Sequence, residues 1–203
     1  MGTSQHLFIT IYRISLLTRN LVSQDLKVVS AVRSELQLFD QHLDSLQPHP
    51  NPDQNTQAGC LHDTVTSELY RIACQIHVKR LLAQDTPDED DNIQQLVISF
   101  INLLHQLPAS SPSQNILSWP LVVAGYSAPT KGYQDIISAK LDQIQSEWRS
   151  DVFSKGAAFL RLKWKTDRGS VCASSGSITS WCRRALATQD YISAWHNCPV
   201  VMA

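Results

Sequence analysis

The chain has few glycines, no paired-cysteine motif and no surplus of charge of either sign. Only 7 of its 203 residues are glycine, and because all-β folds need many tight turns, this scarcity favours helices. The net charge is −1, whereas a domain that binds nucleic acid by itself is usually basic. The five cysteines are irregularly spaced and form no Cys-x-x-Cys. This argues against a disulfide scaffold or a zinc knuckle and favours reduced thiols.

Long apolar runs are also absent. The longest covers Trp119–Tyr126, far short of the ~20 residues that a membrane-spanning helix needs. The N-terminus lacks the apolar stretch of a signal peptide, because Arg13 interrupts it. Met1-Gly2 is a start compatible with myristoylation, but His6 stands where that motif has Ser or Thr. We expect a soluble, intracellular protein without a membrane partner.

Apolar residues recur every three or four positions over most of the chain, which is the period of an amphipathic helix. This predicts helices over 5–21, 24–46, 62–84, 92–107, 131–149 and 152–165, and two short ones over 178–187 and 189–196. There is no β-hairpin signal and no internal repeat. The predicted fold class is all-α, an irregular helical array or bundle of about seven or eight helices.

The predicted helix over 24–46 has the most regular pattern. Its apolar positions alternate in steps of three and four, at Val29, Val32, Leu36, Phe39, Leu43 and Leu46. This seam spans about two and a half heptads, and a coiled coil normally needs three or four. We interpret it as a helix packed in a bundle, with a dimerising coiled coil as the alternative.

Residues 47–60 contain three prolines and few apolar residues, which predicts a flexible Pro-rich linker. The predicted domains are therefore N-terminal helices over 1–46, packing on the main domain, and a main helical domain over 61–203. The acidic run over 88–91 directly precedes the helix predicted over 92–107. We interpret it as a cap that offsets the helix dipole.

Pro120 interrupts the apolar stretch NILSWPLVVAGYSA, residues 115–128. Because proline is tolerated in the first turn of a helix, this predicts a helix that starts near Trp119 with Ser118 as its cap. One helix from about residue 114 with a proline kink is the alternative. Residues 121–125 are apolar on every face, which is typical of a helix at the centre of a bundle. Gly125 would let a neighbouring helix come close.

Several segments in this order resemble one family. A helix reading SELYRIACQIHVKRLL is followed by an apolar helix ending in Leu-Pro and by the pattern W-P-L-x-x-A-G-x-x-A, residues 119–128. These are similar to the fungal-specific transcription factor regulatory domain, the helical region C-terminal to zinc binuclear cluster DNA-binding domains. Leu141, Ile144, the stretch from Trp164 to Asp167 and the ending ISAWHNCPVVMA also resemble it. The resemblance covers about residues 60–203, and it implies that residues 5–46 are the family's upstream helices.

The resemblance implies a nuclear transcription regulator that binds protein partners or a second copy of itself, and possible small-molecule effectors. Two departures matter. The six-cysteine cluster of that family is missing here, so we expect no direct DNA binding by this chain alone. Residues 166–188, rich in Ser, Gly and Cys, do not resemble the family's helical continuation. The alternative is a small helical enzyme or accessory protein of a fungal secondary-metabolite pathway, which would need convergent polar groups such as His77, Tyr70 and Asp63.

No catalytic residue, metal site or cofactor is predicted, and cofactor-binding residues stay unknown. His77 and His105 have no carboxylate or cysteine three or four residues later, and Cys74 falls near a buried helix face, as a core thiol would. There is no Gly-x-Ser-x-Gly, and GSVCASSGS lacks the context of a phosphate loop.

Charged and aromatic residues leave two further expectations. Basic residues interleaved with an aromatic can bind nucleic acid, but in a nearly neutral chain we interpret them as a solvated face; they are Arg161, Lys163, Lys165 and Arg168 around Trp164, and Arg183-Arg184. Three others, Arg71, Lys79 and Arg80, are expected to flank an interface or groove. We expect four aromatics to be core residues, with the lining of an effector groove as the alternative: Tyr70, Trp119, Tyr126 and Trp148.

Overall fold

The structure is a computed structural model that describes residues 2–20, 26–45, 57–82, 90–108 and 111–169. These residues form seven α-helices and one 3-10 helix, and no strand occurs among them. The elements are α1 (Gly2–Asn20), α2 (Leu26–Ser45), α3 (Gln57–Leu82), α4 (Asp91–Leu104), η1 (Pro112–Ile116), α5 (Ser118–Tyr126), α6 (Lys131–Trp148) and α7 (Asp151–Gly169). The predicted all-α fold class is confirmed. The short helices predicted after residue 177, and Arg183-Arg184, lie outside the described residues.

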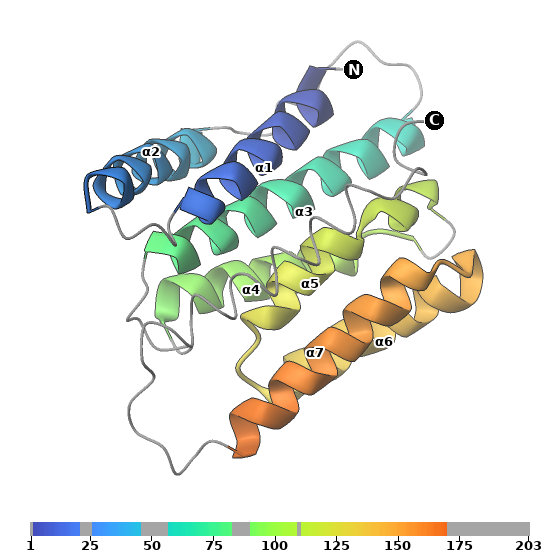
Figure 1. The fold of residues 1–203 in the computed structure, drawn as a ribbon. Coiled ribbons are helices and arrows are strands. Elements are labelled where there is room, and N and C mark those ends of the chain that lie inside the picture. The colour runs from blue at the N-terminus through green and yellow to red at the C-terminus, as the bar shows by residue number, and fades with distance from the viewer. Residues whose placement is uncertain (1, 21–25, 46–56, 83–89, 109–110, 170–203) are drawn as a thin grey trace.

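α3 is the longest helix and lies between two groups of helices (Figure 1). α1 and α2 pack on one side of it, and α4 and α5 pack on the other. α5 also packs against the hairpin of α6 and α7, so it connects α3 to that hairpin. Among the described helices, none is long and apolar enough to cross a membrane.

α5 is buried along nearly its whole length, from Ser118 to Gly125. Pro120 lies in its first turn, and the first hydrogen bond of the helix runs from Leu121 N to Leu117 O, 3.0 Å. Proline therefore costs no hydrogen bond here. The N-cap residue is Leu117 rather than Ser118, so the predicted cap was wrong. A separate 3-10 helix precedes α5, which replaces the alternative of one kinked helix.

The heptad seam of α2 faces the inside of the domain. Val32, Leu36 and Leu43 are buried, and Val29 and Phe39 are partly buried against the same core. α2 packs on α1 and α3, so its apolar stripe is used within the chain, as a bundle helix would use it. Leu46 lies outside the described residues.

The starts of α4 and α3 bear on two predictions from the sequence, the acidic cap and the Pro-rich linker. Asp90 caps α4, because its carboxylate accepts from Asn92 N at 2.9 Å and Ile93 N at 3.2 Å; the predicted acidic cap is confirmed at this residue. α3 begins at Gln57, inside the stretch predicted as a linker over 47–60, and residues 46–56 are outside the described part. The division into domains stays a prediction.

Candidate functional site

The contact between α5 and α7 is close and mostly buried. A Cβ placed on Gly125 would lie 2.5 Å from Leu160 Cδ1 and 3.2 Å from Ile137 Cγ2. A side chain at residue 125 would force buried side chains of α6 and α7 to shift, so glycine favours this close contact, as the sequence predicted. The indole N–H of Trp164 donates to Gly125 O at 3.0 Å. Trp164 on α7 therefore holds a carbonyl in the last turn of α5, where intrahelical donors run out.

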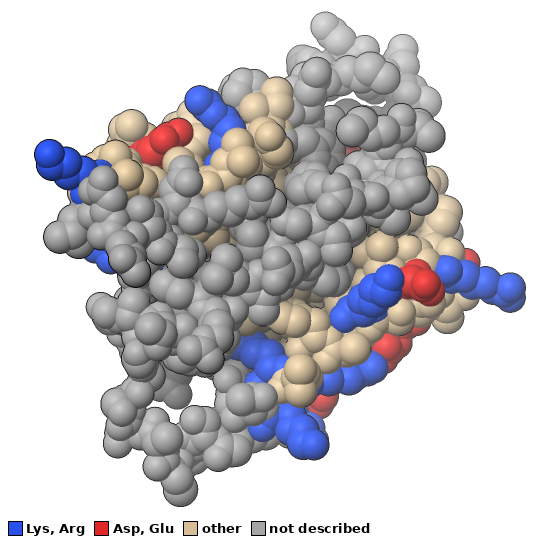
Figure 2. Space-filling view, viewed as in Figure 1, with Lys and Arg blue, Asp and Glu red and all other residues tan. Residues whose placement is uncertain are grey.

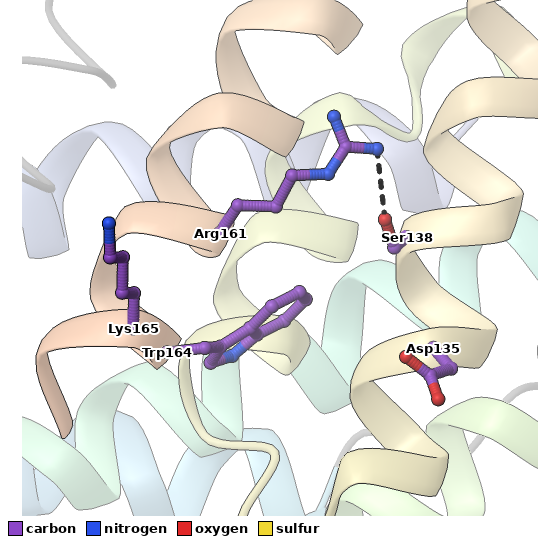
Figure 3. A pocket seen from close by; sticks show the side chains of 5 residues that line it. All are labelled: Asp135, Ser138, Arg161, Trp164 and Lys165. Carbon is purple, nitrogen blue, oxygen red and sulfur yellow. Dashed lines mark hydrogen bonds between the residues drawn. The ribbon is translucent and has the colours of Figure 1, made fainter. Parts of the chain in front are cut away.

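A cavity of about 280 Å³ opens between α6 and α7. It is lined by Asp135 and Ser138 of α6 and by Arg161, Trp164 and Lys165 of α7 (Figure 3). Arg161 and Lys165 are one helical turn apart, which places them on one face of α7, as their spacing predicted. From the sequence, Arg161 and Lys165 were interpreted as part of a solvated basic face. Asp135 and Ser138 were not predicted as site residues, because only the packing of the α6–α7 hairpin brings them next to that face of α7.

Arg161 is held in place by α6. Its guanidinium donates to both carboxylate oxygens of Asp142, at 2.8 and 2.6 Å, and to Ser138 Oγ at 3.1 Å. Both side chains of this ion pair are about half exposed (53% and 54%), so the pair adds little stability. It does fix where the guanidinium lies. Figure 2 shows Lys and Arg side chains along the α6–α7 hairpin with acidic ones between them.

Lys163, another basic residue next to Trp164, is not part of the lining of this cavity. Lys163 lies over the ring of Tyr126, 4.5 Å from its centroid, which is within the range of a cation–π contact. Tyr126 also stacks on Phe159, with centroids 6.2 Å apart. The side chain of Arg168 lies outside the described part. The predicted basic cluster is therefore divided between two faces of α7.

A second cluster lies where α3 meets α5. Tyr70 stacks on Trp119 with centroids 6.0 Å apart, and His77 meets the Trp119 ring edge-on at 6.2 Å. Tyr70 donates its hydroxyl hydrogen bond to Ile116 O. His77 Nε2 and Trp119 Nε1 are buried and have no hydrogen-bond partner among the described residues. This cluster is a packed part of the core.

Burial shifts the pKa values of three residues in and beside this second cluster. It lowers the pKa of His77 to about 4 and raises the pKa of Tyr70 and of the Cys74 thiol well above their ordinary values. Desolvation is the main cause in all three cases, because it disfavours the charged form. Cys74 is fully buried, so the prediction of a core thiol is confirmed. Such a thiol is a poor nucleophile.

Of the polar groups proposed for an enzyme, Tyr70 and His77 both lie against Trp119. Asp63 is exposed, whereas Tyr70 is buried. His105 is exposed at the end of α4, where it is the C-cap residue, and His77 lies on α3. Within the described residues, no group of three or more His, Cys, Asp or Glu could hold a metal ion.

Of the four aromatics expected in the core, Tyr70 and Trp119 are buried and Tyr126 is half-buried. Trp148 is 42% exposed, so that expectation was wrong for it. It is the last residue of α6 and follows the last buried residue, Ile144.

The basic residues of α3 do flank an interface, and it is internal. Arg71 pairs with Glu68 and donates to Leu43 O at 3.1 Å, and Lys79 pairs with Asp40 at 2.9 Å. The hydrogen bond from Arg71 to Leu43 O and the ion pair of Lys79 with Asp40 both connect α3 to α2. Arg80 is buried and its Nε donates to Ser127 Oγ at 3.2 Å, just after α5. The three side chains thus tie α3 to its neighbours.

A family model described as the fungal-specific transcription factor domain matches residues 1–194. The chain belongs to the fungal-specific transcription factor domain family. Its role is therefore in transcription regulation. The match includes α1 and α2, upstream of the region 60–203 where the sequence showed the resemblance, so these helices belong to the fungal-specific transcription factor domain as well. Neither a curated protein nor a solved structure matches the chain.

Proposed function

We propose that this chain is an effector-responsive regulatory domain that acts in the nucleus and controls transcription through a DNA-binding part outside this sequence. Family membership supports the regulatory role. The net charge of −1 and the lack of a six-cysteine array support a division of labour, in which this chain does not bind DNA by itself.

The contact from Trp164 to Gly125 carries the proposal. Trp164 lines the α6–α7 cavity with its side chain and donates to the last turn of α5. α5 is buried on every face and packs on α3, α6 and α7. A molecule in the cavity would favour one placement of Trp164, and this preference would bias the packing of α5. That is a population shift driven by differential binding.

Protein partners, or a second copy of the chain, are part of the same proposal. α1 exposes three apolar side chains at helical spacing, Ile9, Tyr12 and Leu16. Exposed apolar groups on one helix face are a common feature of protein interfaces. This face supports a protein contact that does not use the α6–α7 cavity.

The test is a fusion of this chain to a heterologous DNA-binding domain, assayed on a reporter gene. We expect reporter transcription to differ from that of the DNA-binding domain alone. The same fusion with Gly125→Val, which disrupts the α5 contact, should lose that difference. Reporter output equal to that of the DNA-binding domain alone would refute the regulatory role.

DNA binding by the chain itself is tested separately by a gel-shift titration with duplex DNA at physiological salt. We expect no retarded band at micromolar protein. A tight, salt-resistant complex would contradict the proposed division of labour.

A further inference from the structure

We propose that the α6–α7 cavity binds a small zwitterion of the amino-acid kind, a molecule that carries one carboxylate and one ammonium group. The inference deepens the proposed function, because this molecule would be the effector. It rests on the charges and size of the cavity.

Two charges that line the cavity have no partner among the residues that the structure describes. Asp135 on α6 and Lys165 on α7 are both exposed and line the cavity. No hydrogen bond or ion pair with another described residue engages either side chain. Figure 3 shows Trp164 between them. Within the described part of the chain, the cavity therefore offers one anion and one cation for a ligand, from different helices.

Arg161 adds no further positive charge that a ligand would have to match. Its positive charge is matched by Asp142, which binds it through both carboxylate oxygens. Ser138 Oγ accepts from Arg161 at 3.1 Å, which leaves the hydroxyl hydrogen of Ser138 for a ligand. These bonds orient Arg161 and Ser138 without a ligand, and groups that are oriented in advance bind at lower cost.

The charge pattern selects among ligand classes. A simple anion attracted by Lys165 would face Asp135, and a simple cation attracted by Asp135 would face Lys165. A molecule with both charges satisfies both side chains at once. Specificity of this kind comes from the repulsion of the wrong ligands as much as from attraction of the right one.

The size of the cavity restricts the ligand further. At about 280 Å³ it lies just below the range of roughly 300–1,000 Å³ typical of sites for drug-sized molecules. The ligand is therefore small. The indole of Trp164 supplies an apolar surface for the carbon chain that joins the two charges.

Saturation-transfer NMR on the full chain tests the ligand class. The probes are the unbranched ω-amino acids from glycine to 6-aminohexanoate, each with the carboxylic acid and the amine of the same length. We expect at least one amino acid to bind about fivefold or more tightly than both of its singly charged relatives. Absence of binding by the whole series, or equal binding by a singly charged relative, would overturn the inference.

Substitutions locate the site. Asp135→Asn and Lys165→Gln should each weaken binding of that amino acid about fivefold. Asp63→Asn and Lys155→Gln, exposed charges away from the cavity lining, should leave binding unchanged. The double variant Asp135→Lys with Lys165→Asp exchanges the two charges. It should bind the amino acid again, in the opposite orientation. Equal binding by wild type and both single variants would refute the site.

The reporter fusion separates the two proposals, because its output is scored without any added ligand. An active, Gly125-dependent fusion together with no zwitterion binding would overturn the ligand class and leave the regulatory role standing. An inactive fusion with specific zwitterion binding would do the reverse.

Discussion

The α2–α3 and α5–α7 interfaces hold their helices together by different means. α2 places an apolar seam on α3, and polar contacts flank it, with Gln75 Nε2 donating to Asp44 at 2.6 Å and Lys79 bound to Asp40 at 2.9 Å. α5 meets α7 through Gly125, through the indole hydrogen bond from Trp164 to Gly125, and at its end through Tyr126, which lies against Phe159 and Lys163. One interface has a polar edge, and the other is mostly close packing.

This contrast predicts where sequence changes should matter. Partly exposed ion pairs are weak and screened by salt, so the α2–α3 edge should tolerate substitution. Close-packed contacts leave no space for added atoms, because protein interiors are packed as densely as organic crystals. The α5–α7 contact should therefore be sensitive to one or two added carbon atoms, and it is the better place to transmit a regulatory change.

The largest effect is expected from Gly125→Val. The new Cβ would lie 2.5 Å from Leu160 Cδ1, and the added methyl groups must displace buried side chains of α6 and α7. We expect a loss of about 2–3 kcal/mol in the free energy of unfolding. Urea denaturation followed by circular dichroism measures it.

Gly132→Val is the matched control. Gly132 lies on α6, and a Cβ there meets nothing within 4 Å. Its effect should stay within about 0.5 kcal/mol. If the two variants have the same stability, close approach at Gly125 is not what the fold depends on.

His77 adds a pH dependence to the packed side of the molecule. Its folded-state pKa is about 4, against about 6.5 for an exposed histidine. Below pH 6.5 the unfolded state binds a proton that the folded state refuses, so stability is full above that pH and falls as the pH drops towards 4. The slope can reach about 1.4 kcal/mol per pH unit. Urea midpoints measured from pH 7 down to pH 4 give this slope.

The difference between two histidine variants isolates this residue. His77→Gln should flatten the pH dependence, whereas His105→Gln, at an exposed position, should leave it unchanged. The comparison concerns slopes, so the loss of the partly buried ring at neutral pH does not affect it. An unchanged slope in His77→Gln would assign the pH dependence to other groups.

The sequence predicted the helices well because their stripes are long and regular. The buried positions of α2, and Ile137, Leu141 and Ile144 of α6, follow the three-four spacing. Helix ends were less well predicted. Leu117 caps α5 with its backbone alone, and a backbone cap leaves no residue signature such as the one that identified Asp90.

The candidate site was only half predictable. Arg161 and Lys165 could be found because four-residue spacing places them on one helix face. Asp135 and Ser138 come from a different helix, and their meeting depends on how the α6–α7 hairpin packs on Gly125. The partners of Lys79 and Arg80 likewise come from other helices. Periodicity within one segment carries no information on such contacts.

A pair of tryptophan variants compares two indole N–H groups. Trp164→Phe removes a buried donor that Gly125 O accepts, whereas Trp119→Phe removes one with no partner among the described residues. Both lose similar ring volume. We expect Trp164→Phe to be the more destabilising by about 1 kcal/mol, measured by urea denaturation. Equal losses would mean that the hydrogen bond to Gly125 contributes nothing.

The smallest effect is expected at the polar edge of α2 and α3. The Lys79 and Asp40 side chains are 27% and 21% exposed, and a double-mutant cycle of Lys79→Gln and Asp40→Asn should give a coupling of about 0.5 kcal/mol. Because salt screens partly exposed charges, the coupling should shrink in high salt, while the loss caused by Gly125→Val should not. A coupling as large as that loss, or one insensitive to salt, would contradict the distinction between a polar edge and a packed contact.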